Sequence, residues 1–310
     1  MKQYDVLIVG GGAAGLTAAI YTCRKKLKTG LITVDVGGQT LLTNHIENYP
    51  GYDLIPGPDL MSKFRTQVEK FGAETIMGEV NKIEKMEDFV VSLSNGETYK
   101  SKAVILASGK TARTLDIPGE DKFLGRGVST CATCDAPFFK DKTVAVVGGG
   151  NSAFEAAELL DKFSKKIYLI HRRDMFKADE VTIEKVKKMK KIEVLTNTLP
   201  SEVIGDKFVR GFVVEDAKTK EKRELKVDGI FVEIGYELKT DWLKGIVKRN
   251  KMNEIVIDDR CRTSQEGLFA AGDVSTVPYK QIIVSAGEGA KAGLEAYKYI
   301  KGVEVATDWK

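Results

Sequence analysis

Two cysteines separated by two residues, Cys131 and Cys134, are the residues of this chain best suited to covalent chemistry. A close pair of thiols can bind a metal ion or cycle between a dithiol and a disulfide. Four-ligand zinc would require a second cysteine pair or nearby histidines. The remaining cysteines and histidines stand apart from the pair and from one another: Cys23, Cys261, His45 and His171. We therefore predict no metal site, and we interpret the pair as a redox-active dithiol.

The residue that follows the pair is an acid, Asp135. Its carboxylate could donate or accept the proton that the thiols exchange, although Asp-Ala-Pro is also typical of a turn. Cys23 falls in an expected helix, and Cys261 falls in an expected strand from Glu254 to Arg262. We expect these two cysteines to act as small packing residues.

A glycine-rich turn near the N-terminus indicates an electron source for the dithiol. The apolar run Asp5–Val9 is typical of a buried parallel strand, and it leads into the sequence GGGAAG. Gly10 permits the tight turn, Gly12 lets a pyrophosphate approach the backbone, and Gly15 allows the following helix to pack closely. The N-terminus of that helix, Leu16–Arg24, can hold the phosphates.

The strand after this helix supplies the second half of the dinucleotide signal. The apolar run Gly30–Val34 ends at Asp35, twenty residues after Gly15. A carboxylate at this position accepts hydrogen bonds from ribose hydroxyls. Strand, glycines, helix, strand and acid in this register predict a dinucleotide site, and we assign FAD to it.

The same unit recurs in the middle of the chain. The strand Lys142–Val147 precedes the sequence GGGNSA, and Lys166–Ile170 forms the second strand. That strand ends in His-Arg-Arg, so that Arg173 stands twenty residues past Ala153, where the first unit has its acid. A cation there suits the 2′-phosphate of NADPH, with Lys177 as a further positive charge, unless these are solvated loop charges. FAD would then relay the electron pair of the nicotinamide to the dithiol.

The C-terminal part returns to the first unit. Two further strands follow, Ala103–Gly109, which ends in glycine, and Gly267–Asp273, which ends in glycine and then an acid, and a helix is expected over Gln281–Lys301. We predict an α/β fold with two Rossmann-like three-layer dinucleotide-binding domains, the second inserted in the first. The expected FAD domain comprises residues 1–112 and 240–310, and the NADPH domain with the dithiol comprises residues 113–239. Connectors near Lys110–Leu115 and Gly235–Thr240 would form a hinge.

The composition excludes several classes of protein. The 48 basic residues exceed the 44 acidic ones by only four, which does not favour nucleic-acid binding. The densest basic run, Glu184–Lys191, is typical of a solvated helix face with an apolar stripe. No apolar stretch approaches the roughly 18 residues of a membrane span. The N-terminus does not resemble a signal peptide, so we expect a cytoplasmic protein.

Seven motifs occur in an order and spacing that point to one protein family. They are GGGAAG, GGQ at Gly37–Gln39, ENYPG at Glu47–Gly51, CATCD at Cys131–Asp135, GGGNSA at Gly148–Ala153, HRR at His171–Arg173 and AAGD at Ala270–Asp273. With these motifs the chain resembles the low-molecular-weight thioredoxin reductases over essentially its whole length. The resemblance implies a homodimer with FAD and NADPH sites in each chain and a thioredoxin or glutaredoxin-like partner.

The family resemblance also implies roles for individual residues. Cys134 would lie nearer the flavin than Cys131, and Asp135 would be the acid/base. The dithiol and the nicotinamide would take turns at the flavin by rotation of the inserted domain. The implied FAD contacts are Gly10, Gly12, Ala13, Ala14, Gly15, Asp35, Gly38, Gln39, Thr40, Asn48, Val80, Gly109, Gly272, Asp273, Lys280, Gln281 and Ile282. The implied NADPH contacts are Gly148, Gly150, Asn151, Ser152, Ala153, Glu155, His171, Arg172, Arg173 and Lys177.

Some positions depart from the family pattern. The family usually has arginine where this chain has Lys177, which keeps the charge but loses a bidentate grip and predicts a weaker preference for NADPH. The usual ATG reads Ala107-Ser108-Gly109. The stretch Val277–Ala292 is more similar to the flavoprotein component of alkyl hydroperoxide reductase. That component has an extra N-terminal dithiol domain, and this chain begins at the FAD strand, so we expect any such relay to be a separate protein.

The prediction is therefore a thioredoxin-disulfide reductase that passes electrons from NADPH through FAD and the Cys131–Cys134 dithiol to a thioredoxin-like disulfide. The alternative is an NAD(P)H-dependent reductase of a glutaredoxin-like protein or a peroxiredoxin relay. Two more distant alternatives are a flavoprotein of this fold without a dithiol, which the cysteine pair disfavours, and a nucleotide-sensing protein without turnover, which the intact motifs disfavour.

Overall fold

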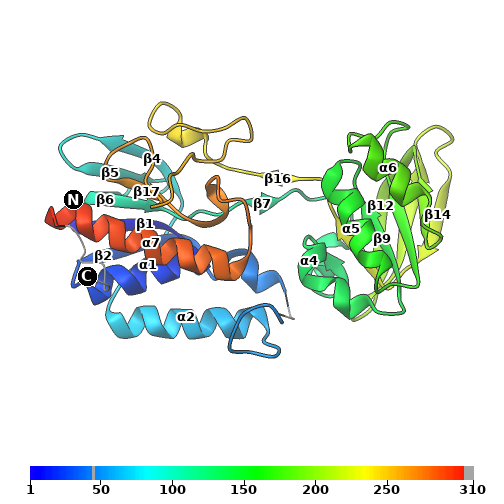
Figure 1. Cartoon of the computed structure of the whole chain (residues 1–310), viewed down its shortest axis with the longest axis horizontal. Coiled ribbons are helices and arrows are strands. Elements are labelled where there is room, and N and C mark those ends of the chain that lie inside the picture. The colour runs from blue at the N-terminus through cyan, green and yellow to red at the C-terminus, as the bar shows by residue number, and fades with distance from the viewer. Residues whose placement is uncertain (44–45, 304–310) are drawn as a thin grey trace. The chain divides into compact units, whose positions relative to one another are not determined.

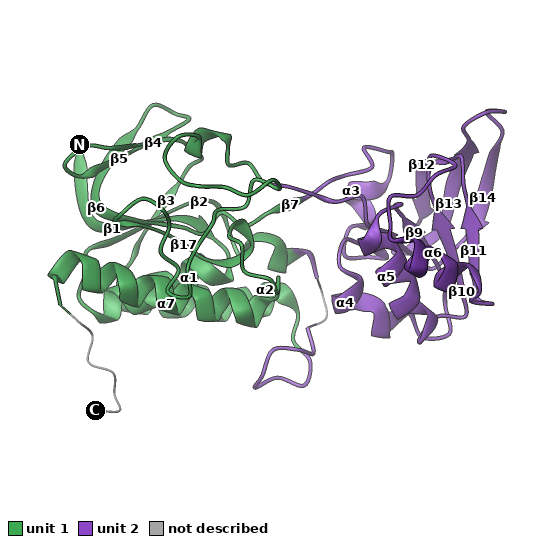
Figure 2. Cartoon of the chain, turned by 45° about the horizontal axis from the view of Figure 1, so that its top comes forward, with its two compact units in different colours: residues 1–41, 55–111, 238–310 green, residues 42–54, 112–237 purple. Residues whose placement is uncertain are grey.

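The computed structural model describes residues 1–43 and 46–303 and divides the chain into two compact units (Figure 2). Unit 1 comprises Met1–Leu41, Ile55–Thr111 and Leu238–Lys310, and unit 2 comprises Leu42–Leu54 and Ala112–Glu237. The segment Leu42–Leu54 therefore groups with unit 2, whereas the expected FAD domain included it. His45 lies outside the described residues.

Unit 1 is built on a seven-stranded sheet in the order β3-β2-β1-β6-β5-β4, with β17 paired to β6 beside β5. β1 and β6 run parallel from the Lys2–Tyr99 pair to the Val9–Leu106 pair. β17 continues the parallel part, whereas β4 and β5 are antiparallel. The strands are β1 (Lys2–Gly11), β2 (Thr29–Val36), β3 (Glu74–Met77), β4 (Val80–Lys85), β5 (Phe89–Leu93), β6 (Thr98–Leu106) and β17 (Leu268–Ala270).

Helices α1 (Ala13–Arg24) and α7 (Ile282–Lys301) lie side by side on one face of this sheet, and α2 (Gly57–Phe71) packs against α1 (Figure 1). Two glycines make the close helix contact possible. A Cβ on Gly289 would overlap the carbonyl of Ala14, and one on Gly293 would lie 3.1 Å from the carbonyl oxygen of Ala18. The opposite face is covered by buried residues that follow the short helix η3 (Asp241–Leu243), such as Val247.

Unit 2 contains a five-stranded parallel sheet in the order β11-β10-β9-β15-β8. Successive side chains of β9 point to opposite faces of the sheet, so the strand contributes to two hydrophobic cores. Val144 and Val146 pack with the helices on one face, whereas Ala145 and Val147 pack with an antiparallel three-stranded sheet on the other. The parallel strands are β8 (Val128–Ser129), β9 (Thr143–Val147), β10 (Lys166–Ile170), β11 (Ile192–Leu195) and β15 (Gly229–Val232).

The outer layers of unit 2 complete a three-layer arrangement. The helical layer is α4 (Ala132–Asp135), η2 (Ala136–Phe139), α5 (Asn151–Asp161) and α6 (Glu180–Lys187). The strand layer is β12 (Thr198–Gly205), β13 (Val209–Asp216) and β14 (Lys222–Lys226), with the short helix α3 (Glu120–Phe123) beside β12. The predicted α/β class, with two three-layer domains and the second inserted in the first, is confirmed.

Two short strands lie where the chain enters unit 2 at residue 112 and leaves it at residue 237. β7 (Thr111–Ala112) pairs with β16 (Tyr236–Glu237), and the N–H of Arg113 donates to the carbonyl of Gly235 at 3.0 Å. Both strands fall inside the connectors expected from the sequence. The two connectors are therefore hydrogen-bonded to each other.

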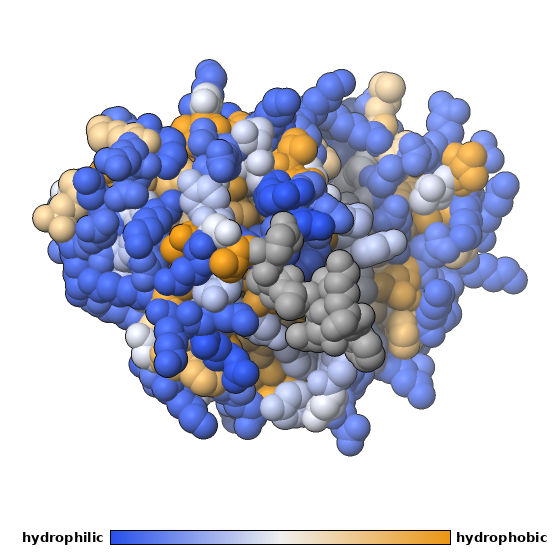
Figure 3. All heavy atoms as spheres, turned by 60° about the vertical axis from the view of Figure 1, so that its left-hand side comes forward, coloured by the Kyte–Doolittle hydropathy of each residue, from blue (hydrophilic) through white to orange (hydrophobic). Residues whose placement is uncertain are grey.

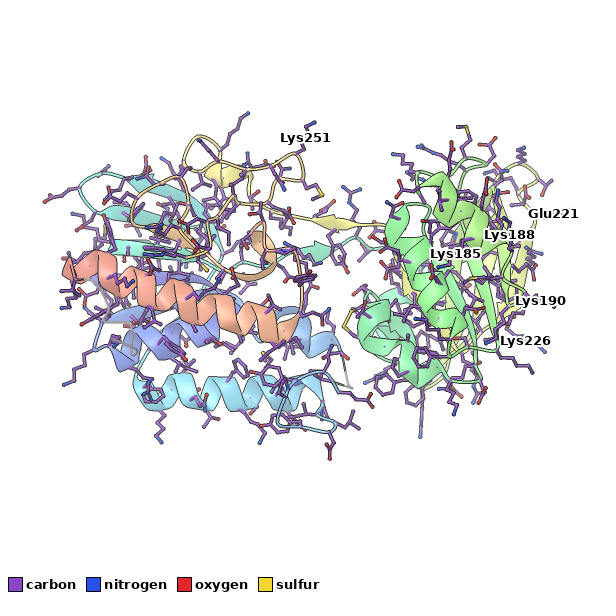
Figure 4. All side chains as sticks on the ribbon, in the orientation of Figure 1. Lys185, Lys188, Lys190, Glu221, Lys226 and Lys251 are labelled. Atoms are coloured by element: carbon purple, nitrogen blue, oxygen red, sulfur yellow. A yellow bond between two sulfur atoms is a disulfide. The ribbon has the colours of Figure 1, made fainter. Side chains whose placement is uncertain are left out.

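Polar side chains predominate on the face of the molecule that one space-filling view shows (Figure 3). The face that Figure 3 brings forward is mostly hydrophilic, with scattered apolar residues. Lys185 and Lys188 of the basic run pair with Glu158 and Glu184, while Val186 is fully buried (Figure 4). Among the residues that the structure describes, no helix combines the length and apolar character needed to cross a membrane.

Candidate active site and dinucleotide sites

Cys131 and Cys134 form a disulfide, with their Cα atoms 5.3 Å apart (Figure 4). Cys131 precedes the first residue of α4, and its carbonyl accepts the N–H groups of Cys134 and Asp135 at 3.2 and 3.1 Å. The helical turn therefore brings side chains three positions apart to the same side, as a disulfide requires. Both cysteines are half-buried.

The turn that carries the disulfide is fixed at both ends. Before it, the buried hydroxyl of Ser129 accepts the N–H of Cys131 at 3.1 Å. After it, Ala136 and Phe139 pack with Ala132 in the helical core of unit 2. The anchoring residues allow the disulfide to open and close without unfolding the helices behind it.

Asp135 is half-buried beside the disulfide turn. The hydroxyl of Thr43 donates to Oδ1 of Asp135 at 3.2 Å. A carboxylate that accepts this bond is held close to its own cysteine pair, one residue after Cys134. Its position suits proton exchange with a thiol.

The other two cysteines have surroundings unlike those of the pair. Cys261 is fully buried, and burial followed by the carboxylate of Glu288 raises the pKa of its thiol. Burial also raises the pKa of Cys23. The expected strand around Cys261 is wrong, because Cys261 has a φ of +63° and follows a turn at Asp259–Arg260. A high pKa makes a thiol unreactive, so redox chemistry falls to Cys131 and Cys134.

The first glycine turn joins β1 to α1 in unit 1. A Cβ on Gly10 would overlap the carbonyl of Ala107, and one on Gly15 would overlap the carbonyl of Gly10. Gly12 differs, because nothing lies within 4 Å of where its Cβ would be. Gly12 precedes α1, and among the described residues no side chain caps this helix. Open space before uncapped N–H groups is a cradle for a phosphate, so these residues fit the pyrophosphate of FAD.

The acid at the end of β2 is oriented toward this turn. Oδ1 of Asp35 accepts the N–H of Gly38 at 2.7 Å, and Gly38 itself lies against Gly12. Asp35 is exposed. Gln39 and Thr40 follow in the short helix η1 (Gly38–Leu42). Held by one oxygen, the Asp35 carboxylate can present the other to a ribose hydroxyl.

The C-terminal return brings more of the predicted FAD residues to the same unit. A Cβ on Gly272 would lie 3.0 Å from that of Ala14. Oδ1 of Asp273 accepts a bond from the hydroxyl of Ser285 at 3.3 Å, and its other oxygen pairs with Lys110 at 3.7 Å. Gln281 precedes the first residue of α7, Ile282.

Three predicted FAD residues have other placements. Val80 is buried in the core of unit 1 on β4. Gly109 has a φ of +66° and open space beside it. Asn48 is exposed and belongs to the segment Leu42–Leu54, which the structure groups with unit 2 rather than with the other predicted FAD residues.

The second glycine turn joins β9 to α5 in unit 2. Nothing lies within 4 Å of a Cβ at Gly150, and among the described residues no side chain caps α5. A Cβ on Gly148 would lie 2.6 Å from that of Ala153. Ser152 is exposed on the first turn of the helix, and Glu155 is exposed at the start of the second. This turn therefore offers a second phosphate cradle, which fits the pyrophosphate of NADPH.

The loop after β10 carries the predicted cations. The ring of His171 lies against Gly149, and its Nε2 is 3.1 Å from the carbonyl oxygen of Met175. Burial lowers the pKa of His171, and the neighbouring Arg172 and Arg173 lower it further. Both arginines are exposed. The positive charge at this strand end therefore comes from the arginines, while His171 fixes the loop on the glycine turn.

Two backbone and side-chain contacts hold the rest of this loop. The N–H of Lys177 donates to the carbonyl of Gly149 at 2.7 Å, while the Lys177 side chain is exposed. Asn151 exchanges two hydrogen bonds with Asp179, at 3.0 and 2.8 Å. The loop with Arg172, Arg173 and Lys177 is thereby tied to the first residue of α5.

Sequence reasoning missed several residues of these sites. Ser129 could have been found, because a serine two residues before a backbone donor is typical of a local side-chain turn. Lys110 directly follows a strand-ending glycine at the edge where ligands bind in such sheets. Thr43 and Asp179 had no local signal, because each meets its partner through the tertiary fold. Within the described residues, no group of three or more possible metal ligands occurs.

Comparisons with known proteins agree with this geometry. The chain is 40% identical to the thioredoxin reductase of Mycolicibacterium smegmatis, covering 96% of each. It is 41% identical to an alkyl hydroperoxide reductase component of Pseudomonas putida, covering 96% of this chain but 58% of that protein. Thus the chain spans less than two thirds of the length of some curated relatives. The crystal structure of thioredoxin reductase from Streptococcus pyogenes superposes with a TM-score of 0.92 at 38% identity, covering 97% of this chain and 99% of that one.

The resemblance to thioredoxin reductases read from the motifs is confirmed by these relatives, and so is the additional similarity to alkyl hydroperoxide reductase. The family model described as pyridine nucleotide-disulphide oxidoreductase matches residues 4–291. That range contains both glycine turns, the disulfide and the return to unit 1. The chain therefore belongs to the pyridine nucleotide-disulphide oxidoreductase family.

Proposed function

We propose that this chain is a thioredoxin-disulfide reductase that moves electrons from NADPH through FAD and Cys131–Cys134 to the disulfide of a thioredoxin-like protein. The observation that carries the proposal is the closed disulfide on an anchored turn, beside Asp135, in a chain with two phosphate cradles. The thioredoxin reductase of M. smegmatis, which matches 96% of the chain, supports the choice of partner.

We assign the two cofactors to the two glycine turns. FAD occupies the turn at Gly12, with Asp35 at its ribose, in the domain of residues 1–112 and 240–310. NADPH occupies the turn at Gly150, with Arg172 and Arg173 at its 2′-phosphate, in the domain of residues 113–239. FAD bound there supplies a two-electron carrier between a nicotinamide and a disulfide.

The protein side of the reaction requires two electrons and two protons for each disulfide. The Cys131–Cys134 bond breaks when it takes up the electron pair, and Asp135 delivers a proton to Cys134. The Cys131 thiolate then attacks the partner disulfide to form a mixed disulfide, and one partner sulfur leaves as a thiolate. Asp135 takes the proton back from Cys134, and the Cys134 thiolate attacks Cys131, so that the second partner sulfur also leaves as a thiolate. The two partner thiolates take up the two protons, one from Asp135 and one from solvent, and the Cys131–Cys134 bond is restored.

The second candidate is a reductase for a glutaredoxin-like protein or a peroxiredoxin relay. Identity of 41% to the alkyl hydroperoxide reductase component of P. putida supports it. The chemistry at Cys131 and Cys134 would be the same, and only the partner would change. We further propose a cytoplasmic homodimer as the working form, which the family resemblance supports and which sedimentation of the purified protein would test.

The deciding experiment has two stages. Purified protein should be yellow and should bleach anaerobically with NADPH; a colourless protein that takes up no FAD would contradict the assignment. NADPH-driven turnover is then compared across a panel of thioredoxin, glutaredoxin-like and peroxiredoxin-type partners. Turnover highest with thioredoxin supports the first candidate, whereas turnover only with the others selects the second.

A further inference from the structure

We propose that Lys280 and Glu254 form a clasp that shapes the Gly272–Ser275 turn of the FAD site, with Lys280 positioning the turn rather than contacting the cofactor phosphates. The inference rests on the proposed FAD site in unit 1 and assigns Glu254 to it. It changes the role expected for Lys280, which the motif alone had grouped with the cofactor contacts.

All three ammonium hydrogens of Lys280 have protein acceptors. Its Nζ lies 2.5 Å from the carbonyl oxygen of Ser275, 3.3 Å from that of Asp273 and 2.9 Å from Oε1 of Glu254. Only 19% of the Lys280 side chain and 14% of the Glu254 side chain are exposed. A lysine has three donors, so this ammonium is saturated before any cofactor binds.

Glu254 is itself fixed by the loop that precedes it. Its Oε2 accepts the side-chain N–H of Asn250 at 2.6 Å, and its backbone N–H donates to Oδ1 of Asn250 at 3.0 Å. Oδ1 of Asn250 also accepts the N–H of Met252 at 2.9 Å. The carboxylate therefore stands in one position, and it neutralises the charge of Lys280 at short range.

The turn that the clasp holds lies against the first phosphate cradle. Gly272 has a φ of +75° and packs against Ala14 in the first turn of α1. The hydroxyl of Ser275 donates to the carbonyl of Gly272 at 2.7 Å, which closes the turn on itself. Lys280 grips two of the turn's carbonyls from outside, so its removal would loosen Asp273, whose carboxylate faces Lys110 and Ser285.

Two roles for Lys280 make opposite predictions about Glu254. If Lys280 bound the pyrophosphate directly, Glu254 would compete for its charge, and Glu254→Gln would leave FAD binding unchanged or strengthen it. If the two residues form a clasp, Glu254→Gln removes the same support as Lys280→Met. The sign of the Glu254→Gln effect therefore separates the two roles.

The test is a double-mutant cycle on the full chain, freed of flavin and titrated with FAD while flavin fluorescence is followed. We expect Lys280→Met and Glu254→Gln each to weaken FAD binding about tenfold, and the double variant to be no weaker than either, because contacting residues couple. The ratio of variant to unaltered affinity should not change with ionic strength, because no ion pair with the phosphates is lost.

A readout without cofactor accompanies the titration. In the flavin-free protein, hydrogen exchange of the amides at Asp273–Thr276 should speed up in both single variants. Lys291→Met is the matched control, because Lys291 also bridges a carboxylate and a carbonyl, those of Glu288 and Asp259, away from this turn. It should leave FAD affinity unchanged. If Lys280→Met yields little folded protein, Lys280→Gln completes the cycle.

The inference is overturned if Glu254→Gln binds FAD as well as or better than the unaltered chain, or if the two effects add in the double variant. A loss in Lys280→Met that shrinks at high salt would likewise identify a direct phosphate contact. Failure of the unaltered chain to bind FAD is a different result, since it contradicts the proposed function.

Discussion

The two glycine turns of this chain have matching positions at the two assigned dinucleotide sites. They differ in the residues that allow the first helical turn to pack closely. In unit 1, a Cβ at Gly15 would overlap the carbonyl of Gly10, and a Cβ at Gly10 would overlap the carbonyl of Ala107, so both positions require glycine. In unit 2, Ala153 supplies the Cβ, and Gly148 leaves room for it. Gly12 and Gly150 are alike, since both face open space. What the two turns share is the open position, which indicates that this position serves a ligand.

The residues at the strand ends beside these turns differ in charge and in how firmly their side chains are held. Asp35 is held by the N–H of Gly38, so its carboxylate is oriented before a ligand arrives. Arg172 and Arg173 are exposed, and only the backbone of their loop is fixed, through His171 and Lys177. Ribose hydroxyls need an acceptor at a defined angle, whereas a phosphate dianion can be met by long flexible cations. The difference supports assigning the turns to different cofactors.

Cys134→Ser should produce the largest effect, because it removes the chemistry of unit 2 and leaves unit 1 intact. The rate of NADPH-driven reduction of a thioredoxin-like protein should fall about a thousandfold or more, because removing one member of a catalytic group abolishes most of the rate that the group provides. FAD content and anaerobic bleaching by NADPH should persist. Stopped-flow absorbance and a redoxin turnover assay measure the two halves separately.

Cys23→Ser is the control for that variant, because Cys23 is a half-buried cysteine of unit 1 with no disulfide. It should retain full turnover. If Cys134→Ser still reduced a thioredoxin-like protein, the dithiol role would be contradicted. The disulfide chemistry could then no longer be assigned to unit 2.

Replacing either open glycine, Gly12 or Gly150, with valine should weaken binding of the ligand at its own site and leave binding at the other site unchanged. Gly12→Val should weaken FAD binding about a hundredfold, since a branched side chain would displace the phosphate from N–H groups worth roughly 1.5–3 kcal/mol per bond to a charged group. Gly150→Val should do the same to NADPH and spare FAD. Calorimetric titration of each ligand against each variant measures the pattern.

Loss of both ligands in both variants would contradict separate sites, provided that circular dichroism shows each variant folded. Gly15→Ala sharpens the comparison further. It should destabilise the protein because the Cβ meets the carbonyl of Gly10, although alanine occupies the matching position 153 in unit 2.

Much of the fold could be predicted because its signals are local. Runs such as Asp5–Val9 are buried on both faces of a parallel sheet, so they are apolar without interruption, and the glycines that follow have backbone roles that no other residue fills. The disulfide could be predicted as well, since the spacing of Cys131 and Cys134 places both on one helical turn. Strand ends and helix starts differ from the expectation by a few residues only.

The parts that the sequence did not reveal depend on contacts between distant residues. Thr43 meets Asp135 from 92 positions away. Cys261 was expected in a strand, yet it directly follows a turn. Its thiol donates to the carboxylate of Glu288 on α7. Lys280 was assigned to the cofactor from a motif, whereas its partner Glu254 was expected only as the start of a strand and not as part of a site. A motif identifies which residues gather at a site but not which of them bind each other.

Arg173→Ala should have a smaller effect than the glycine variants and should act on cofactor choice. Loss of one cation at the 2′-phosphate should weaken NADPH binding about tenfold to a hundredfold, because a bond to a charged group contributes roughly 1.5–3 kcal/mol. NADH binding should change little. Steady-state kinetics with both nucleotides give the ratio. The matched control is Arg210→Ala, an exposed arginine of the same unit that pairs with Asp206. Equal losses for NADPH and NADH in Arg173→Ala would contradict a phosphate contact.

The smallest effect concerns His171, whose ring lies against Gly149, at the position where Thr33 lies against Gly11 in unit 1. Burial, reinforced by Arg172 and Arg173, lowers the pKa of His171 below its ordinary value in the folded chain. The unfolded chain then binds more protons below pH ~6.5, so stability should fall as the pH drops from neutrality toward the folded pKa. His171→Gln removes this dependence, and the melting temperature of the unaltered protein should lose on the order of a degree more than that of the variant between pH 7.5 and 5.5. A greater loss in the variant would mean that the folded state favours protonated His171, which would make it a third cation beside the two arginines.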